Sequence, residues 1–309
     1  MDVVTVFGAS GFIGRHVVRE IARTGARVRA AVRRPEHAGF LKPMGDVGQI
    51  APMAANVRDD ASVAAAVAGA DTVINLVGIL HEQGRQRFAD VQADGARRVA
   101  AAAKAAGAER LVQMSAIGAD PDSDSLYAST KGIAERHVRE IFPDAVIVRP
   151  SIVFGPEDDF FNRFAALARF VPALPLIGGG HTRFQPVHVG DIADAIAAAA
   201  AGKAAPGTTF EFGGPQTYTF RRLMEMILHE IGRKRLLVPV PFPLATAQAA
   251  ILELSPIPLL TRDQVRLLRH DNVVSGELPG LDDLGIEATA LEAILPTYLR
   301  RYRRGVWHT

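Results

Sequence analysis

The chain has 309 residues, of which 48% are hydrophobic and 22% are charged, a composition typical of a globular protein with a large core. It contains no cysteine, which excludes disulfides, thiolate metal sites and a cysteine nucleophile. The formal net charge of +2 is too small to indicate a nucleic acid as partner.

The most apolar stretch, residues 236–260, is interrupted by five prolines. Its proline-free part, residues 244–255, would rise only about 18 Å as a helix, whereas the hydrocarbon core of a membrane is about 30 Å thick. We therefore expect no transmembrane segment. Met1 leads directly into an apolar run with no room for a signal peptide, so we expect a cytoplasmic location.

Over the first 150 residues, short apolar runs alternate with alanine-rich stretches, a pattern that predicts strands separated by helices. Alternation of this kind implies parallel strands joined by crossover helices. We therefore predict an α/β fold with a doubly wound, parallel Rossmann sheet. Its predicted strands are residues 3–7, 27–32, 72–76, 111–114 and 146–148.

After residue 150 this regularity ends, and prolines and glycines cluster. We predict a strand over residues 183–189 and a helix over 191–201, with Asp191 as its N-cap, that return to the sheet. Further helices are predicted over residues 219–231 and 259–270.

These elements predict two parts. The first is a dinucleotide-binding domain over residues 1–155, with residues 183–213 returning to its sheet. The second is a smaller, mostly helical C-terminal lobe, built from residues 156–182 and 214–309, that covers the carboxyl edge of the sheet, where ligands of such folds bind.

A glycine-rich turn, Gly8-Ala9-Ser10-Gly11-Phe12-Ile13-Gly14, connects the first strand to a helix predicted over residues 12–23. Gly8 permits the tight turn, Gly11 lets the backbone approach a pyrophosphate, and Gly14 lets helix and strand pack closely. The helix N-terminus favours an anion. We therefore predict a dinucleotide site that includes Ser10, Phe12 and Ile13.

The second strand ends in Arg33 and Arg34, where NAD-preferring proteins carry an acidic residue. A guanidinium group pairs well with a 2′-phosphate, and Arg15 can assist. The sequence therefore favours NADP(H) over NAD(H). The alternative is that both arginines belong to a solvated basic turn.

Tyr127 and Lys131 stand four residues apart, on one face of a helix predicted to begin near Ser125. The ammonium group can stabilise a phenolate, so Tyr127 is a candidate general base, and Lys131 can also hold the nicotinamide ribose. Ser115 ends a strand at the carboxyl edge, where its hydroxyl can polarise a substrate carbonyl or alcohol. A capping or turn role for Ser115 is an equal alternative.

Together these residues resemble the short-chain dehydrogenase/reductase superfamily, in the extended or atypical branch related to nucleotide-sugar epimerases. Within that branch the chain resembles the NADPH-binding accessory subunit of respiratory complex I and its bacterial relatives. The broad likeness lies in the glycine turn, the Tyr127 and Lys131 pair, and residues 75–78, 149–156, 187–191 and 212–215. The narrower likeness lies in residues 142–145, 241–245, 260–265 and 271–274.

The resemblance implies a protein with a mainly structural NADP(H), acting as an accessory or assembly subunit with complex I subunits as partners. It carries the cofactor role over to Gly8, Gly11, Gly14, Arg33, Tyr127 and Lys131. At further strand ends, the expected cofactor contacts are Asn56, Val57, Val77, Gly78, Pro150 and Ile152.

Two departures from the family pattern weaken a catalytic assignment. Ser115 is followed by Ala116 and Ile117 rather than by further hydroxyl residues, and Asp94-Gly95 lacks the usual asparagine. The alternative function is an active NADP(H)-dependent oxidoreductase or epimerase that uses Tyr127 as general base on a secondary alcohol or carbonyl. The sequence names no substrate and leaves turnover open.

The tail, residues 298–307, combines arginines with aromatic residues. This mixture suits an anionic membrane surface or an acidic partner, so the protein could lie on the cytoplasmic face of the inner membrane. A solvated terminal helix is the alternative. The nine histidines show no metal-ligand spacing, and no metal site is expected.

Overall fold

The computed structural model describes residues 2–255 and 258–303. The chain divides into two compact units, each assembled from three segments. Unit 1 comprises Met1–Pro150, Val189–Phe212 and Gly276–Glu287. Unit 2 comprises Ser151–His188, Gly213–Ser275 and Ala288–Thr309.

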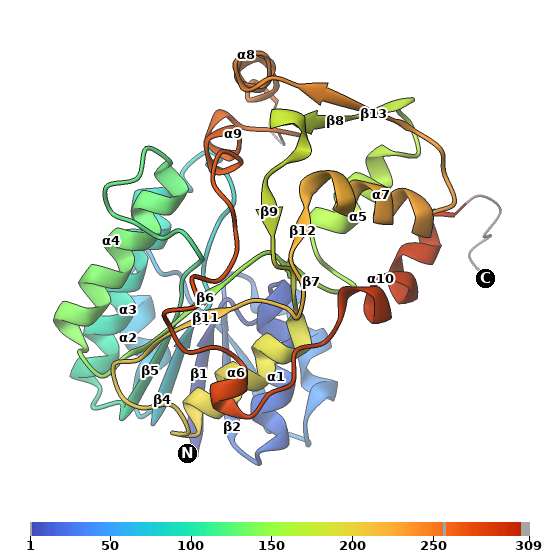
Figure 1. Cartoon of the computed structure of the whole chain (residues 1–309). Coiled ribbons are helices and arrows are strands. Elements are labelled where there is room, and N and C mark those ends of the chain that lie inside the picture. Colours follow the sequence, from blue (N-terminus) through green and yellow to red (C-terminus); the bar gives the residue numbers. More distant parts are fainter. Residues whose placement is uncertain (1, 256–257, 304–309) are drawn as a thin grey trace. The chain divides into compact units, whose positions relative to one another are not determined.

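Unit 1 is built around a seven-stranded sheet in the order β11-β6-β5-β4-β1-β2-β3, and every neighbouring pair is parallel (Figure 1). The order reverses between β1 and β4, which is the topological switch point where such sheets bind ligands. The strands are β1 (Val3–Phe7), β2 (Arg27–Val32), β3 (Ile50–Ala54), β4 (Thr72–Asn75), β5 (Arg110–Met114), β6 (Val146–Pro150) and β11 (Thr209–Phe212).

Helices cover both faces of this sheet, with α1 against α6 on one face, and α2, α3 and α4 side by side on the other (Figure 1). Their bounds are α1 (Phe12–Arg23), α2 (Asp60–Val67), α3 (Asp94–Ala105), α4 (Leu126–Ile141) and α6 (Val189–Ala200). The central strands β1, β4 and β5 are buried apart from the first residue of β1 and of β5, because both faces are covered. Alanines of α2 and α3 form much of the adjoining core, where their small side chains allow close packing.

The described part of unit 2 contains three two-stranded sheets, which pair β7 with β10, β9 with β12, and β8 with β13. Leucines and phenylalanines make up much of its core, including Phe161 and Phe220. Its strands are β7 (Val153–Phe154), β8 (Ala173–Ile177), β9 (Arg183–Phe184), β10 (Val187–His188), β12 (Tyr218–Thr219) and β13 (Leu236–Val240). Its helices are α5 (Phe160–Leu167), α7 (Phe220–Glu230), α8 (Phe242–Leu252), α9 (Arg262–Leu267) and α10 (Leu291–Leu299).

The predicted fold class is confirmed, and the helix over residues 12–23 has the predicted bounds. Two predictions were wrong in detail, and one strand was missed. The single strand over residues 183–189 is two separate strands, β9 and β10, and β3 was not predicted at all. Asp191 is not an N-cap, because α6 already begins at Val189 and places this buried carboxylate in its first turn. Within the described residues, no helix is both long enough and apolar enough to cross a bilayer.

Candidate functional site

The turn between β1 and α1 has a shape that requires its glycines. Gly8 has a φ of +78°, which side chains disfavour. A Cβ atom on Gly14 would lie 2.2 Å from the Gly8 carbonyl oxygen, and one on Gly11 would lie 3.2 Å from it. The helix begins at Phe12, with no acidic side chain in its first turn to compete for the amides. The turn is therefore a cradle that fits a pyrophosphate.

Arg15 lies close to this turn. Its Nε and Nη2 atoms lie 3.4 Å from the Gly11 carbonyl oxygen and 3.5 Å from the Ser10 carbonyl oxygen. Its guanidinium group lies 5.0 Å from the centroid of the Phe40 ring. A cation is thus held beside the glycine turn by local contacts.

The end of β2 presents the two predicted arginines, both exposed. The Nη1 atom of Arg33 donates to Oε1 of Gln86 (2.6 Å), in the loop that follows β4. Within residues 2–255 and 258–303, no carboxylate pairs with Arg33 or Arg34. The strand end therefore keeps its positive charge.

The turn after β3 contains Asn56 and Val57. Asn56 shapes this turn, because its Oδ1 accepts from the Arg58 N–H (3.2 Å) and its own N–H donates to the Ser62 hydroxyl (2.7 Å). Val57 is buried against α3, where a Cβ atom on Gly95 would lie 3.1 Å from Val57 Cγ2. This contact explains the glycine of the Asp94-Gly95 pair.

The ends of β4 and β5 meet α4 at Lys131. The buried Nζ atom of Lys131 donates to the Met114 carbonyl oxygen (3.3 Å). A Cβ atom on Gly78 would lie 3.4 Å from the same nitrogen. Val77 is fixed by its N–H, which donates to Oδ1 of Asn75 (3.2 Å). The structure thus brings Val77, Gly78 and Lys131 together, as expected of one site.

Tyr127 and Lys131 share a face of α4, with Lys131 Nζ 6.0 Å from the centroid of the Tyr127 ring. Desolvation lowers the pKa of Lys131 to about 8, although the Glu135 carboxylate opposes this shift. The Tyr127 ring keeps some surface exposed, yet desolvation raises its pKa to about 12. Near neutral pH the phenol therefore keeps its proton and is a poor base in this state.

Ser115 is buried, and its hydroxyl donates to Oε1 of Glu135. The same carboxylate accepts two hydrogen bonds from Arg149, from Nε (2.8 Å) and Nη2 (2.6 Å). Arg149 also lies 3.8 Å from the Glu211 carboxylate, and these carboxylates raise its pKa. The hydroxyl proton of Ser115 is thus committed to a buried ionic network.

Sequence reasoning missed Glu135 and Arg149, the members of this network. Glu135 follows Lys131 by four residues and therefore lies on the same face of α4 as Tyr127 and Lys131. That spacing was the available signal.

The last two predicted cofactor contacts, Pro150 and Ile152, belong to different units. Pro150 is the last residue of β6 in unit 1. Ile152 belongs to unit 2, where its N–H donates to Oδ1 of Asn272 (3.0 Å) and its side chain packs against the hydrophobic core of that unit.

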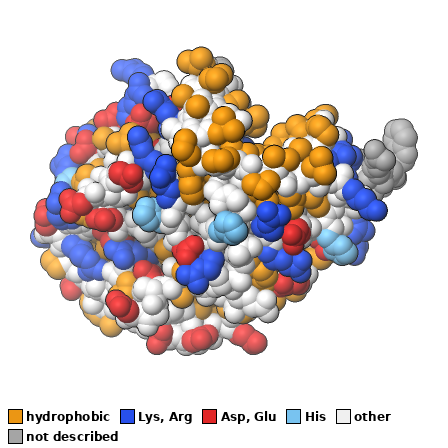
Figure 2. All heavy atoms as spheres, turned by 45° about the horizontal axis from the view of Figure 1, so that its top comes forward, with side chains coloured by type: hydrophobic (Ala, Val, Ile, Leu, Met, Phe, Trp, Pro, Cys, Tyr) orange, Lys and Arg blue, Asp and Glu red, His pale blue; other side chains and the backbone are white. Residues whose placement is uncertain are grey.

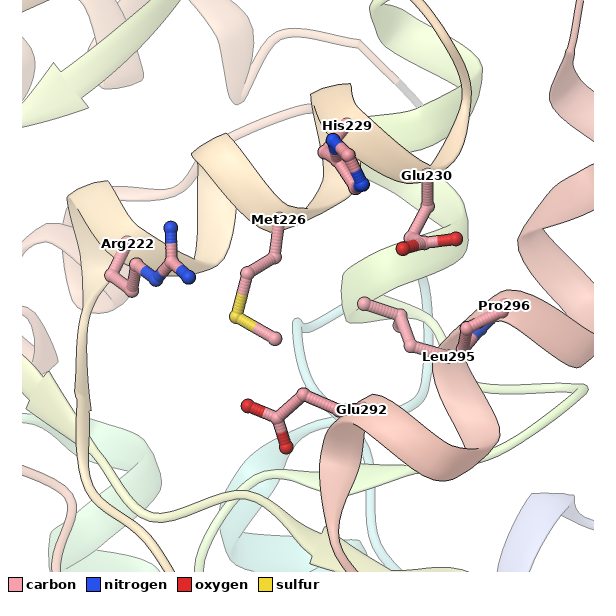
Figure 3. A pocket seen from close by; sticks show the side chains of 7 residues that line it. All are labelled: Arg222, Met226, His229, Glu230, Glu292, Leu295 and Pro296. Carbon is pink, nitrogen blue, oxygen red and sulfur yellow. The ribbon is translucent and has the colours of Figure 1, made fainter.

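Unit 2 has a cavity of about 360 Å³ between α7 and α10 (Figure 3). None of the predicted site residues lines it. Its acidic groups have partners within the unit, since Glu292 accepts from the Tyr218 hydroxyl (2.7 Å) and Glu230 lies 3.6 Å from Arg303. The cavity therefore does not indicate a second cofactor site.

Comparison with known proteins places these observations in a family. A family model described as NAD(P)H-binding matches residues 8–160, so the chain carries a domain for a nicotinamide dinucleotide. The NADPH-dependent quinone oxidoreductase of Escherichia coli, solved with NADPH, has the same fold, with a TM-score of 0.75 at 20% identity over 96% of this chain and 99% of that one.

Two characterised relatives are more similar in sequence. The ceramide reductase of Caulobacter vibrioides is 32% identical over 81% of this chain and 77% of its own length. The mitochondrial NADH dehydrogenase (ubiquinone) 1 alpha subcomplex subunit 9 of Rattus norvegicus is 38% identical over 99% of this chain and 81% of its own length. The chain therefore belongs to the family of NAD(P)H-binding proteins, with the short-chain dehydrogenase/reductase fold, that includes this subunit 9.

Proposed function

We propose that this protein is an NADP(H)-binding accessory or assembly subunit of respiratory complex I, in which the cofactor is mainly structural. The likeness to the mitochondrial subunit extends over almost the whole chain, which supports a shared role. The residues that would hold the dinucleotide lie around the switch point of the sheet. In unit 1 they are Gly8, Ser10, Gly11, Phe12, Ile13, Gly14, Arg15, Arg33, Arg34, Asn56, Val57, Val77, Gly78, Tyr127, Lys131 and Pro150, and the remaining residue of the proposed set, Ile152, belongs to unit 2.

The observation that carries a structural role is the network around Ser115. In a dehydrogenase of this fold, the cofactor supplies hydride transfer while a serine and a tyrosine manage the substrate proton. Here the Ser115 hydroxyl donates to Glu135, and Tyr127 holds its own proton to high pH. The chain thus keeps the cradle for the dinucleotide, whereas its Ser115 hydroxyl is engaged in a buried ionic network and Tyr127 is a poor base near neutral pH.

NADP(H) is the form of the cofactor that the charges support. Arg33 and Arg34 place two cations at the end of β2, where a carboxylate would repel a 2′-phosphate. We expect Arg33→Asp to weaken NADPH binding by about tenfold or more while NADH binding changes little, because only NADPH carries the extra phosphate. Fluorescence titration with both coenzymes measures this. Equal affinities of the natural chain for NADH and NADPH would contradict it.

Contact with partners is supported by an apolar surface of unit 2. Figure 2 shows hydrophobic side chains gathered on the face that carries α8 and β13, and Leu236, Leu244, Ile251 and Leu254 are more than half exposed there. A surface of this kind is typical of an interaction site. We propose that the protein attaches peripherally to the complex at the cytoplasmic face of the inner membrane.

The basic tail is a weaker candidate for membrane contact. Arg301 donates to the Pro156 carbonyl oxygen (3.0 Å) and also to Asn162, and Arg303 donates to the Glu230 carbonyl oxygen (2.6 Å). Two of its arginines are therefore used within unit 2. Arg304 and Trp307 lie outside the described residues.

The proposal is tested by gentle purification of the tagged full-length chain from its own cells. We expect NADPH fluorescence and complex I subunits to accompany the protein, and we expect Tyr127→Phe to retain both. Loss of complex I activity in Tyr127→Phe cells, with NADPH still bound, would instead favour the alternative of an active reductase. Absence of complex I subunits from the purified natural chain would contradict the accessory role.

A further inference from the structure

A second group of cations lies in unit 1, apart from the glycine turn. It surrounds a cavity of about 370 Å³, the arginine pocket, which is lined by Arg58, Arg85, Arg87, Asp90 and Arg98. Three separate segments contribute to it, namely the turn between β3 and α2, the loop between β4 and α3, and α3 itself. The fold therefore gathers guanidinium groups that are distant in sequence around one space.

The charges of the arginine pocket are only partly balanced. The Glu82 carboxylate lies 3.1 Å from Arg87, and the Asp60 carboxylate lies 3.2 Å from Arg98. Within the part of the chain that the structure describes, Arg58 and Arg85 have no carboxylate partner. The Nη1 atom of Arg58 donates instead to the backbone carbonyl oxygen of Arg85 (2.6 Å). Asp90 lines the pocket as well, so its four arginines stand against three carboxylates, those of Glu82, Asp60 and Asp90, and the pocket keeps one positive charge in excess.

Arg98 also has a donor that its surroundings do not satisfy. Its Nη1 atom is shielded from solvent and makes no hydrogen bond to any described residue, whereas its Nε atom lies 3.2 Å from Oδ1 of Asp60. A buried donor on a charged group is costly when it lacks an acceptor. A phosphate has several oxygens that match the planar donors of guanidinium groups, and one of these oxygens would supply the missing acceptor.

The pocket is tied to the end of β2 through its own loop. Gln86, which stands between Arg85 and Arg87, accepts the hydrogen bond from Arg33. Reciprocal backbone hydrogen bonds between Gln83 and Gln86 (3.1 and 2.9 Å) close the turn that carries these residues. The loop that supplies two pocket arginines is therefore fastened beside the candidate 2′-phosphate site.

We propose that the arginine pocket binds a phosphate monoester. Two sources share this chemistry, which are the 2′-phosphate of NADP(H) and the phosphate of a separate molecule. The first source rests on the proposed function, whereas the second does not.

The test is a calorimetric titration of the full-length protein with inorganic phosphate. Arg85→Gln removes an exposed pocket cation that has no carboxylate partner, and Arg97→Gln is its matched control, because Arg97 lies beside Arg98 in α3, pairs with Asp94 (3.7 Å) and does not line the pocket. We expect Arg85→Gln to weaken phosphate binding about tenfold and Arg97→Gln to leave it unchanged. Arg58→Gln should repeat the effect of Arg85→Gln.

The proposal is overturned if the natural chain does not bind phosphate, or if the pocket variants bind it as well as Arg97→Gln does. Titrations with NADPH and NADH then identify the source. A loss of affinity of Arg85→Gln for NADPH but not for NADH assigns the 2′-phosphate to the pocket. Unchanged binding of both coenzymes, with weakened phosphate binding, assigns a separate phosphorylated molecule. If the natural chain bound neither coenzyme, the proposed cofactor role would fail while the phosphate result would stand.

Discussion

At the scale of one residue, Lys131 shows how burial lowers the pKa of an ammonium group. Its pKa in the folded chain is about 8, below the ordinary value of 10.5, because the protein excludes water from the ammonium group. The Glu135 carboxylate compensates only in part for that loss. Charged Lys131 therefore lowers the free energy of unfolding at neutral pH, as expected of a residue that serves binding rather than folding.

The shift has a defined effect on stability. Between pH 8 and 10.5 the folded chain binds fewer protons at Lys131 than the unfolded chain, so the free energy of unfolding rises with pH across that window. The full rise is about 3 kcal/mol for a shift of this size. Above pH 10 Tyr127 acts in the opposite direction, because its pKa is raised to about 12.

We expect Lys131→Met to lose this rise, and the exposed Lys104→Met on α3 to keep it. Urea unfolding between pH 7.5 and 9.5 measures the slope. Parallel curves for the natural chain and Lys131→Met would show that burial does not shift this lysine.

Ser115 belongs to a buried ionic group rather than to an open active site. We expect Ser115→Ala to lower the free energy of unfolding by about 1–3 kcal/mol, because Glu135 loses a hydrogen bond in a place that water reaches poorly. NADPH affinity should not change. Denaturation and coenzyme titration of the same variant measure the two effects. A variant of natural stability with impaired NADPH binding would instead place Ser115 in the cofactor site.

At the scale of elements, the sequence predicted those parts whose structure is set locally. The helix α4 begins after Ser125, whose hydroxyl accepts from the Ala128 N–H (3.3 Å), and the glycine turn opens α1 where it was predicted. The strand β3 has Pro52 in its middle, and a proline in a sequence disfavours the prediction of a strand. A proline is tolerated here because β3 lies at the edge of the sheet. Pairing with β2 decides its structure.

The prediction of one strand from Arg183 to Val189 was wrong because the sequence suggests a longer strand than the structure forms. Its β-branched and aromatic residues suggest one strand, but Gln185 and Pro186 divide it. The Gln185 N–H donates to the Asn272 carbonyl oxygen (3.1 Å), a partner almost ninety positions further along the chain. A hydrogen bond between residues so far apart in the sequence cannot be predicted from the local sequence pattern.

The glycine turn yields a prediction for the element that it opens. We expect Gly14→Ala to abolish dinucleotide binding and lower stability, because the added Cβ atom would meet the Gly8 carbonyl oxygen at 2.2 Å and force α1 away from β1. Gly39→Ala is the control, since Gly39 has open space around its Cβ position and no positive φ. Coenzyme titration and thermal unfolding compare them. Natural affinity in Gly14→Ala would mean that the coenzyme does not use this turn.

At the scale of the whole molecule, the chain returns to unit 1 twice after leaving it. The second return, residues 276–287, reaches β11 through a hydrogen bond from the Glu211 N–H to the Pro279 carbonyl oxygen (3.0 Å). The composition of residues 276–287 does not predict a contact with a strand at the edge of the sheet. The glycine turn and the strand ends of the candidate site were easier to predict than the return of residues 276–287, because they are local features of the sequence. The network of Ser115, Glu135 and Arg149 could not be predicted, because it depends on which strands become neighbours.

The central claim is that the backbone amides at the start of α1 hold the pyrophosphate of a dinucleotide, beside the cations at the end of β2. A crystal structure of the full-length protein grown with saturating NADPH tests it most directly. We predict pyrophosphate oxygens within about 3 Å of the Phe12 and Ile13 backbone nitrogens, with the 2′-phosphate next to Arg33. Coenzyme bound elsewhere, or no coenzyme in this turn, would contradict the account.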